Sequence, residues 1–163
     1  MATFKFEGVD ELVKKYEKLE KDSEKIIGEA IYKGAGYVAR VIQNSIAGIA
    51  TDNRNKIGTP DDPLSGPKTI QVIGLQKSLG IAKMRNDNSF RNVKIGFDGY
   101  NTLKTKRWPN GQPNMMVARS IESGTSWMQK QPFMRKAEQA AKGPCEMIMA
   151  DSVESAIQKS IGE

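Results

Sequence analysis

The sequence contains no histidine, and this absence removes several enzyme classes at once. Ser-His-Asp and Cys-His catalysis both need an imidazole as the general base. Common zinc sites need several His or Cys ligands, whereas the only cysteine in the chain is Cys145. A single cysteine forms no disulfide within the chain, in agreement with a reducing compartment. Carboxylate-only chemistry and magnesium sites are not excluded on these grounds, but we expect a protein that is not an enzyme, with no catalytic, metal-binding or cofactor-binding residue and no cofactor.

Long apolar runs are also absent. No run approaches the roughly 20 residues that a membrane-spanning helix needs, and the first residues lack the apolar stretch of a signal peptide. We therefore expect a soluble protein made in a cytoplasm. With 163 residues, 38% hydrophobic and 27% charged, the chain has the size of one domain but is somewhat polar for a compact monomer. This composition favours a small core with long solvated or partner-dependent segments.

Two weak motifs remain that could carry chemistry. Residues 34–39 fit the loose dinucleotide pattern G-x-G-x-x-G/A, but they lie inside a helical stripe instead of between a strand and a helix. The acid pairs Asp61-Asp62 and Glu20/Glu24 could hold magnesium or act as acid and base. The first pair lies in a proline-rich loop and the second on a polar helix face, so we expect both pairs to be solvated. We interpret the glycines as positions of close packing.

Acidic residues are scarce in the middle of the chain. Residues 68–136 contain thirteen Lys or Arg but only three acids, Asp87, Asp98 and Glu122, a balance of +10. The rest carries twelve basic and sixteen acidic residues, a balance of −4, so the net charge of +6 is unevenly distributed. This asymmetry indicates an anionic partner for the middle segment, either an acidic protein surface or nucleic acid. The alternative is a solvated basic face that keeps the protein soluble.

Hydrophobic periodicity predicts long helices at both ends of the chain. Apolar residues recur at three- and four-residue spacing over residues 9–49, with a break expected near Asp22-Ser23. A second long helix is predicted over residues 133–161, kinked or split at Gly143-Pro144. A short helix is predicted over residues 114–123, with a strand as the alternative.

Between the long helices, the pattern predicts strands and loops. The strand candidates are residues 4–6, 69–73, 79–84 and 92–97, with a turn at Asn86-Asp87-Asn88 and a helical turn at residues 75–78. Residues 51–68 and 98–113 are predicted to be long, mobile loops. The result is a single α+β domain, residues 1–163, with a small, largely antiparallel sheet packed by long N-terminal and C-terminal helices and with two long loops.

The loop at residues 98–113 interleaves aromatic and basic side chains, which are Tyr100, Lys104, Lys106, Arg107 and Trp108. Such residues can stack on bases and contact phosphates. They are also the usual anchors of protein interfaces. Exposed aromatic residues on a long loop are typical of an arm that orders when a neighbouring subunit arrives, so we favour protein contact and keep nucleic acid as the alternative.

A turn between two helical segments follows at residues 117–137. Gly124 can take a positive φ and end the first helix. Pro132 suits the first turn of the second helix, and Phe133 is placed to enter a core. Glu122, one of few acids in the basic segment, is expected to pair with a Lys or Arg of this chain or of a neighbouring subunit. Trp127 and Met128 are further candidates for the core at this turn.

Several short motifs occur in a defined order along the chain. They are Gly8-Val9-Asp10-Glu11-Leu12, Leu75-Gln76-Lys77-Ser78-Leu79, Val93-Lys94-Ile95-Gly96-Phe97, Glu122-Ser123-Gly124-Thr125-Ser126 and Gln131-Pro132-Phe133-Met134-Arg135, the last followed by Ala137. In order and spacing they resemble, over most of the chain, the phage virion proteins typified by the gene-ten product of phage Hong Kong 97. Many relatives carry T-G-x-L where this chain has Val72-Ile73-Gly74-Leu75, and the insertion at residues 98–113 looks long.

The resemblance implies a structural protein of the virion, in the neck or upper tail of a phage, prophage or phage-tail-like particle. Such a protein joins head to tail or completes the tail, and it is assembled in the bacterial host cytoplasm. The implied partners are further copies of itself in a homo-oligomeric ring and neighbouring neck or tail proteins, with DNA close by and no membrane. The interface residues that we expect are Tyr100, Lys104, Lys106, Arg107, Trp108, Arg119, Glu122, Gly124, Thr125 and Trp127. The alternative function is a basic nucleic-acid-binding module.

Overall fold

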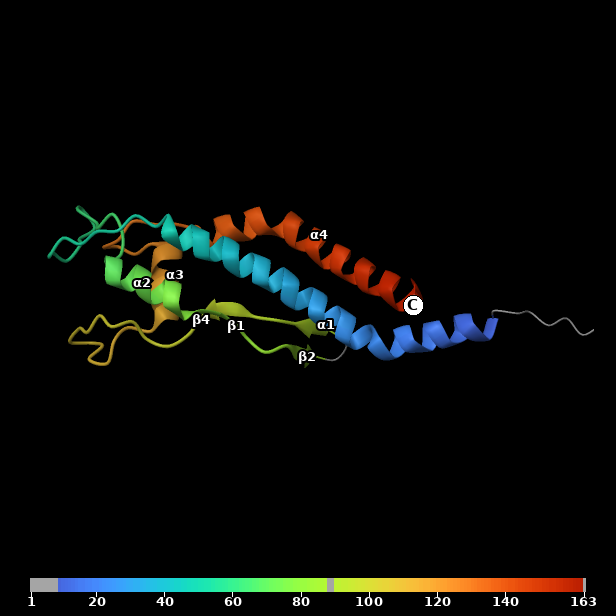
Figure 1. The fold of residues 1–163 in the computed structure, drawn as a ribbon. Coiled ribbons are helices and arrows are strands. Elements are labelled where there is room, and N and C mark those ends of the chain that lie inside the picture. The colour runs from blue at the N-terminus through green and yellow to red at the C-terminus, as the bar shows by residue number, and fades with distance from the viewer. Residues whose placement is uncertain (1–8, 88–89, 163) are drawn as a thin grey trace, which may run out of the picture.

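The computed structural model describes residues 9–87 and 90–162, so the predicted strand at residues 4–6 lies outside the described residues. In chain order the elements are α1 (Val9–Ala47), α2 (Thr69–Ser78), β1 (Leu79–Ile81), β2 (Arg85–Asp87), β3 (Phe90–Asn92), β4 (Ile95–Phe97), α3 (Asn114–Ser123) and α4 (Phe133–Gly162). The α+β class is confirmed, with long N-terminal and C-terminal helices and a small set of antiparallel strands. Figure 1 shows an elongated molecule in which α4 runs back along α1, while α2, α3 and both loops gather at one end.

Helix α1 forms the long axis of the molecule. Its 39 residues span about 58 Å at 1.5 Å per residue. The predicted break near Asp22-Ser23 is wrong, because the helix continues through both residues. The Ser23 hydroxyl donates a hydrogen bond of 2.7 Å to the Glu20 carbonyl, which satisfies the polar side chain inside the helix. Such back-bonding bends helices without ending them, and Figure 1 shows α1 changing direction in its blue N-terminal part.

The strands form one long, irregular hairpin that lies against α1. Strands β1 and β4 pair with Ile81 opposite Ile95, and β2 and β3 pair with Arg85 opposite Asn92. Three residues, 82–84, therefore oppose two, 93 and 94, which is a β-bulge. The bulge is the reason why the predicted strands 79–84 and 92–97 are each shorter in the structure. Asn86 and Asp87, expected in the turn, lie in β2 instead.

The predicted strand at residues 69–73 is wrong, because these residues begin helix α2. Their β-branched side chains favour a strand locally. The Gln71 side chain, however, accepts a hydrogen bond of 2.9 Å from the Lys68 N–H and so closes the first turn of a helix. Val72 and Leu75, three residues apart, are then both buried on one face of the helix. Packing on the core therefore overrides the local preference.

The hydrophobic core lies where the C-terminal end of α1 meets α2, β4, α3 and the start of α4. Its buried members are Ile42, Ile46, Ile49, Val72, Leu75, Phe97, Val117, Ala118, Ile121, Met128, Phe133 and Ala137. Phe133 contacts Phe97 with ring centroids 6.1 Å apart. The predictions that Phe133 and Met128 enter the core and that residues 114–123 form a helix are confirmed. The core therefore supports one end of the elongated molecule.

Of the two alternatives at Gly143-Pro144, a kink or a split, the split is wrong, because helix α4 continues through both residues, and the kink stays a prediction. Both residues are exposed, and the carbonyl that loses its partner at Pro144 can therefore bind water. On the facing side of α1, a Cβ at Gly34 would lie 2.8 Å from the Met149 side chain. Gly34 thus allows α1 and α4 to approach closely, as the packing interpretation expects, whereas a Cβ at Gly36 would meet no atom within 4 Å, so that interpretation is wrong for Gly36.

We predict that Leu75→Ala lowers the free energy of unfolding by about 2–5 kcal/mol, because Leu75 is fully buried and leaves a cavity. Ile57→Ala is the matched control, since Ile57 is 89% exposed and its truncation should change stability by less than about 0.5 kcal/mol. Urea denaturation followed by circular dichroism measures both values. Equal midpoints for the two variants would contradict this placement of the core.

Candidate interaction surface

The two long loops meet at the core end of the molecule and enclose a cleft of about 420 Å³. Its walls come from the loop at residues 51–68, the loop at residues 98–113, α3 and the turn at residues 125–128. The large side chains in its lining include Leu64, Lys68, Arg107, Trp108, Met116 and Trp127. The structure therefore brings together three of the predicted interface residues, Arg107, Trp108 and Trp127, from two distant parts of the chain.

Trp108 is held in the cleft by a tight turn of its own loop. The backbones of Thr105 and Trp108 exchange two hydrogen bonds of 3.1 and 3.0 Å. The Trp108 carbonyl also accepts a hydrogen bond of 3.1 Å from the Gly111 N–H. The exposed Arg107 guanidinium lies 5.8 Å from the centroid of the Trp108 ring, within cation–π range. The loop thus presents an aromatic ring with a positive charge over it.

The other predicted residues of this loop lie apart from the cleft. Lys104 and Lys106 are exposed and do not line it. Tyr100, 65% exposed, borders a different hollow beside Ile73 and Lys77 of α2. The base of the loop is closed by a hydrogen bond of 2.9 Å from the Asn101 N–H to the Gln112 carbonyl. The mobility expected for the loop stays a prediction.

The turn after α3 carries Trp127 at its tip. Gly124 has the predicted positive φ, 72°, and a Cβ there would lie 2.9 Å from Lys130. The backbones of Thr125 and Met128 then hydrogen-bond each other, which leaves Trp127 55% exposed rather than in the core. Thr125 itself is partly buried. Arg119 is exposed on α3 and does not line the cleft.

Glu122 does not fulfil the expected pairing with a Lys or Arg within the described chain. Its carboxylate accepts hydrogen bonds of 2.8 Å from the Met134 N–H and 3.2 Å from the Arg135 N–H. These groups belong to the first turn of α4, where backbone N–H groups have no partner in the helix and the helix dipole favours negative charge. Glu122 therefore fixes the angle between α3 and α4, and Pro132 lies directly before the first residue of α4.

Gln131 ties this turn to the first loop, a role that the sequence analysis missed. Its amide nitrogen donates hydrogen bonds of 2.9 Å to the carbonyls of Ala50 and Ser65. Its amide oxygen accepts one of 2.8 Å from the Ala50 N–H. Its own backbone N–H donates to the Ile121 carbonyl at 2.8 Å. In the sequence, Gln131 is recognisable only as a glutamine directly before Pro-Phe, and nothing there indicates which groups its side chain binds.

Asp52 organises the first loop and was also missed. It is 5% exposed, and its carboxylate accepts hydrogen bonds from the Arg54 side chain at 2.9 and 2.5 Å and from the Ser65 N–H at 3.1 Å. The hydrogen bonds from Arg54 hold the pKa of Asp52 well below its usual range. Of the candidate acid pair, Asp62 forms an ion pair with Lys56, which lowers the pKa of Asp62. That contact gives Asp62 a structural role in the loop.

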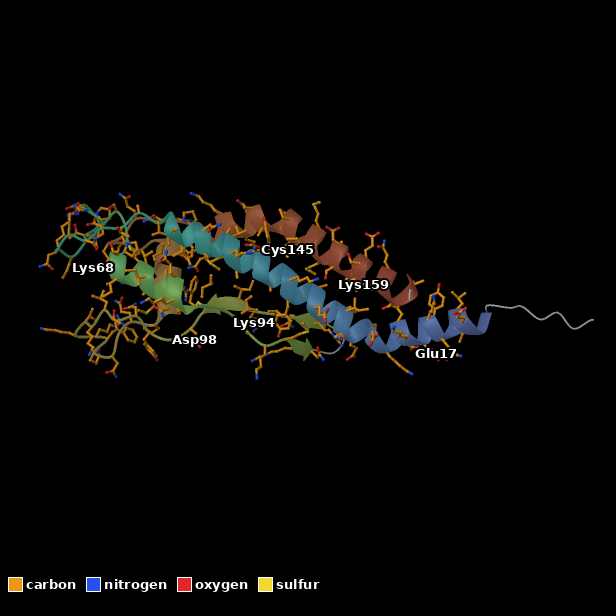
Figure 2. All side chains as sticks on the ribbon, in the orientation of Figure 1. Glu17, Lys68, Lys94, Asp98, Cys145 and Lys159 are labelled. Carbon is orange, nitrogen blue, oxygen red and sulfur yellow. The ribbon has the colours of Figure 1, made fainter. Side chains whose placement is uncertain are left out.

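The basic segment at residues 68–136 does not form a single patch. Figure 2 shows Lys68 at the loop end of the molecule and Lys94 farther along the hairpin. Lys104, Lys106 and Arg107 extend the first group, whereas exposed Lys83 and Arg85 belong to the second. The sequence therefore indicates the excess of charge, and the fold divides it between two regions.

Comparisons with protein-family models, with curated proteins and with solved structures find no match to this chain. Within residues 9–87 and 90–162, no helix is long and apolar enough to cross a membrane. The same residues contain no group of three or more His, Cys, Asp or Glu side chains that could hold a metal ion.

We predict that Asp52→Asn flattens the dependence of stability on pH in acid. The folded-state pKa of Asp52 is depressed below the unfolded value of about 3.9, so its contribution is complete above that value and is lost as the pH falls further. Thermal unfolding between about pH 6 and pH 2 should show a steeper loss for the wild type than for the variant. Asp61→Asn is the control, because Asp61 is exposed. Parallel curves for the wild type and Asp52→Asn would exclude this role.

Proposed function

We propose that the chain is a structural subunit of the neck or upper tail of a phage, prophage or phage-tail-like particle, which joins head to tail or completes the tail. The observation that carries this proposal is the cleft in which Trp108 and Trp127 from separate segments flank a half-open apolar surface. Trp and Arg anchors in a pocket of this kind are typical of protein interfaces. The motifs resemble those of the Hong Kong 97 gene-ten family, and this resemblance is the reason why we place such a surface in a phage particle.

The residues that line the cleft are suited to binding another protein and not to catalysis. Its positive charges come from Lys68 and Arg107, and among the described residues no Asp, Glu, His or Cys lines it. A general acid–base pair of the common kinds therefore has no place there. We propose that the protein is not an enzyme and that the cleft receives an acidic or polar segment of a neighbouring neck or tail protein.

A small core is compatible with the proposed role in a ring. Subunits repeated around an axis need only modest pairwise affinity, because each contact in a ring is reinforced by the others. A core at one end of a long helix is sufficient to present the loops, and the rest of the surface stays available for neighbouring copies. Assembly would take place in the cytoplasm of the bacterial host, and the finished protein would belong to the virion.

Nucleic acid is the second candidate partner, and the position of the Arg107 guanidinium within cation–π range of Trp108 is the observation that favours it. Aromatic and basic side chains together can bind single strands. This alternative predicts an affinity that falls steeply between about 50 and about 200 mM salt. Fluorescence anisotropy with single- and double-stranded DNA tests it. We favour protein because Trp108 lines a cleft together with Leu64 and Met116 instead of an open groove.

We predict that replacing residues 102–111 with Asn-Gly abolishes the joining of heads to tails while the domain still folds. The replacement removes Lys104, Lys106, Arg107 and Trp108, and it closes the loop where Asn101 and Gln112 already share a hydrogen bond. Electron microscopy of particles from the strain that encodes the chain should then show separate heads and tails. Circular dichroism of the purified variant checks that it folds.

The location of the protein is tested separately. An antibody against the chain should label the head–tail junction or the upper tail of wild-type particles. Particles of normal yield and shape from the replacement variant, or no label on any particle, would contradict the proposed function.

A further inference from the structure

The hairpin carries one large exposed apolar side chain among mostly basic residues, with Asp87 of β2 directly opposite it. Phe90, the first residue of β3, is 77% exposed. Exposed Arg85 lies in the partner strand, and exposed Lys83 and Lys94 follow along the same hairpin. An exposed aromatic side chain of this size on a basic element is a typical anchor for an apolar pocket with an acidic rim.

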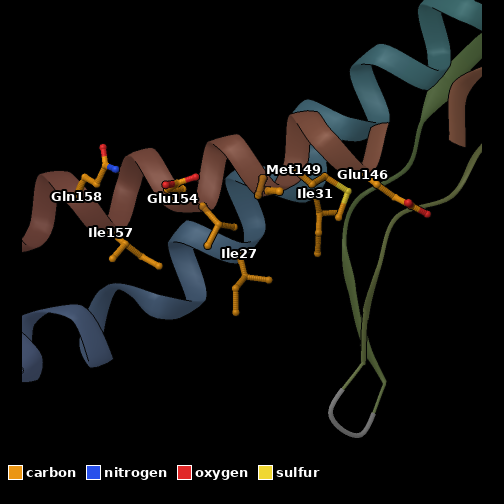
Figure 3. A pocket seen from close by; sticks show the side chains of 10 residues that line it. Ile27, Ile31, Glu146, Met149, Glu154, Ile157 and Gln158 are labelled. Atoms are coloured by element: carbon orange, nitrogen blue, oxygen red, sulfur yellow. The ribbon is translucent and has the colours of Figure 1, made fainter. Parts of the chain in front are cut away.

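A groove of that description lies between α1 and α4, with a volume of about 770 Å³. Its apolar lining comprises Ile27, Ala30, Ile31, Met149, Ala150, Val153 and Ile157. Ile27 is 45% exposed, so the groove opens to solvent. Glu146 and Glu154 are among the residues that line it, and Figure 3 shows Glu154 on α4 beside the apolar side chains and the Glu146 carboxylate extending away from them. Among the groove's described residues there is no Lys or Arg to neutralise them.

The hairpin and the groove lie at the same level along α1. On the hairpin side, the Tyr32 hydroxyl accepts a hydrogen bond of 2.9 Å from the Met84 N–H, and the Arg91 guanidinium pairs with Glu24 at 2.8 Å. On the groove side, Ile27 and Ile31 fall between those two positions in the sequence. Figure 1 shows α4 and the hairpin on different sides of α1. The two surfaces therefore face different directions with little offset along the helix.

We propose that the hairpin of one copy of this chain docks in the α1–α4 groove of the next, with Phe90 among Ile27, Ile31 and Ile157. Arg85 and Lys83 then approach Glu146 and Glu154 of the neighbouring copy. The contact joins two different surfaces, so it is heterologous, and repetition generates either a closed ring or a filament. Because both surfaces lie at one level along α1, repetition requires little translation, which favours a ring. The inference deepens the proposed function, since it assigns the contact between ring subunits.

Two single variants and their mixture test the contact. Phe90→Glu removes the hairpin anchor, and Ile27→Glu places a charge in the open part of the groove. Each variant alone should lose about tenfold or more in association constant and sediment as a monomer, because burial of one large apolar side chain contributes at least that factor. An equimolar mixture should form dimers and nothing larger, since one intact hairpin then meets one intact groove. Wild-type protein should form larger species, measured by light scattering and sedimentation.

Ile57→Glu is the matched control, because Ile57 is an exposed apolar residue of the loop at residues 51–68 and lies in neither surface. It should associate like the wild type, and all variants should keep the wild-type circular dichroism spectrum. A wild type that stays monomeric at every concentration, or Phe90→Glu and Ile27→Glu variants that associate normally, would overturn the proposal.

The other candidate occupant of the groove is the segment before Val9, whose sequence includes Phe4 and Phe6. Deletion of residues 1–8 should leave association unchanged if the hairpin is the occupant. Loss of association on this deletion, with Phe90→Glu unaffected, would assign the groove to that segment and overturn the proposal. The proposed function is judged independently: labelling at the neck with a monomeric protein rejects only the subunit contact, and association in solution without any label on particles rejects only the function.

Discussion

The set of hydrogen bonds made by Gln131 is the interaction on which the candidate surface depends. This one side chain binds Ala50, three residues after the end of α1, and Ser65 in the first loop, while its backbone N–H binds the Ile121 carbonyl in α3. Leu64, next to Ser65, exchanges backbone hydrogen bonds of 2.8 Å with Trp127 and Gln129. The loop at residues 51–68, the end of α3 and the turn at residues 125–128 are therefore joined at this one short segment. A polar side chain with three satisfied hydrogen bonds gives this junction a single geometry, which apolar packing alone would not specify.

Close backbone approach makes the junction possible. A Cβ at Gly66 would lie 1.8 Å from the Ala50 carbonyl, and one at Gly58 would lie 2.0 Å from the Trp127 carbonyl. Both contacts are shorter than any side chain allows, so the first loop can reach α1 and the turn only with glycine at these two positions. The loop is long because it must cross from the end of α1 to the Trp127 turn and return to α2. The length of the loop therefore follows from the path between α1, the Trp127 turn and α2.

The sequence predicts that long helices exist at both ends because their apolar residues repeat over many turns, as at Ile42 and Ile46. The break predicted near residue 22 and the split predicted at residue 143 do not occur. Prediction from the sequence also fails where a few local residues compete with a distant contact. Residues 69–73 have the composition of a strand, yet the burial of Val72 and Leu75 makes them helical. Glu122 illustrates the same limit in the site. The sequence shows that Glu122 is a rare acid in a basic segment. It does not show that Glu122 binds the first turn of α4, twelve residues later, because that contact depends on how α3 and α4 are arranged in the fold.

The number of charged residues can be read from the sequence, but their distribution over the surface depends on the fold. The excess of Lys and Arg over residues 68–136 is a property of the sequence, and a uniform basic face would suit one extended anionic partner. The hairpin carries part of this charge along α1, away from the loops that carry the rest. On another side of α1, Glu146 and Glu154 of α4 line an apolar groove, so acidic side chains border the groove while the hairpin is mostly basic. Charges of opposite sign on different sides favour lateral contact between copies, whereas the loop cleft at one end is free for a different partner. The length of α1 keeps these two surfaces apart, so both can be occupied in the same assembly.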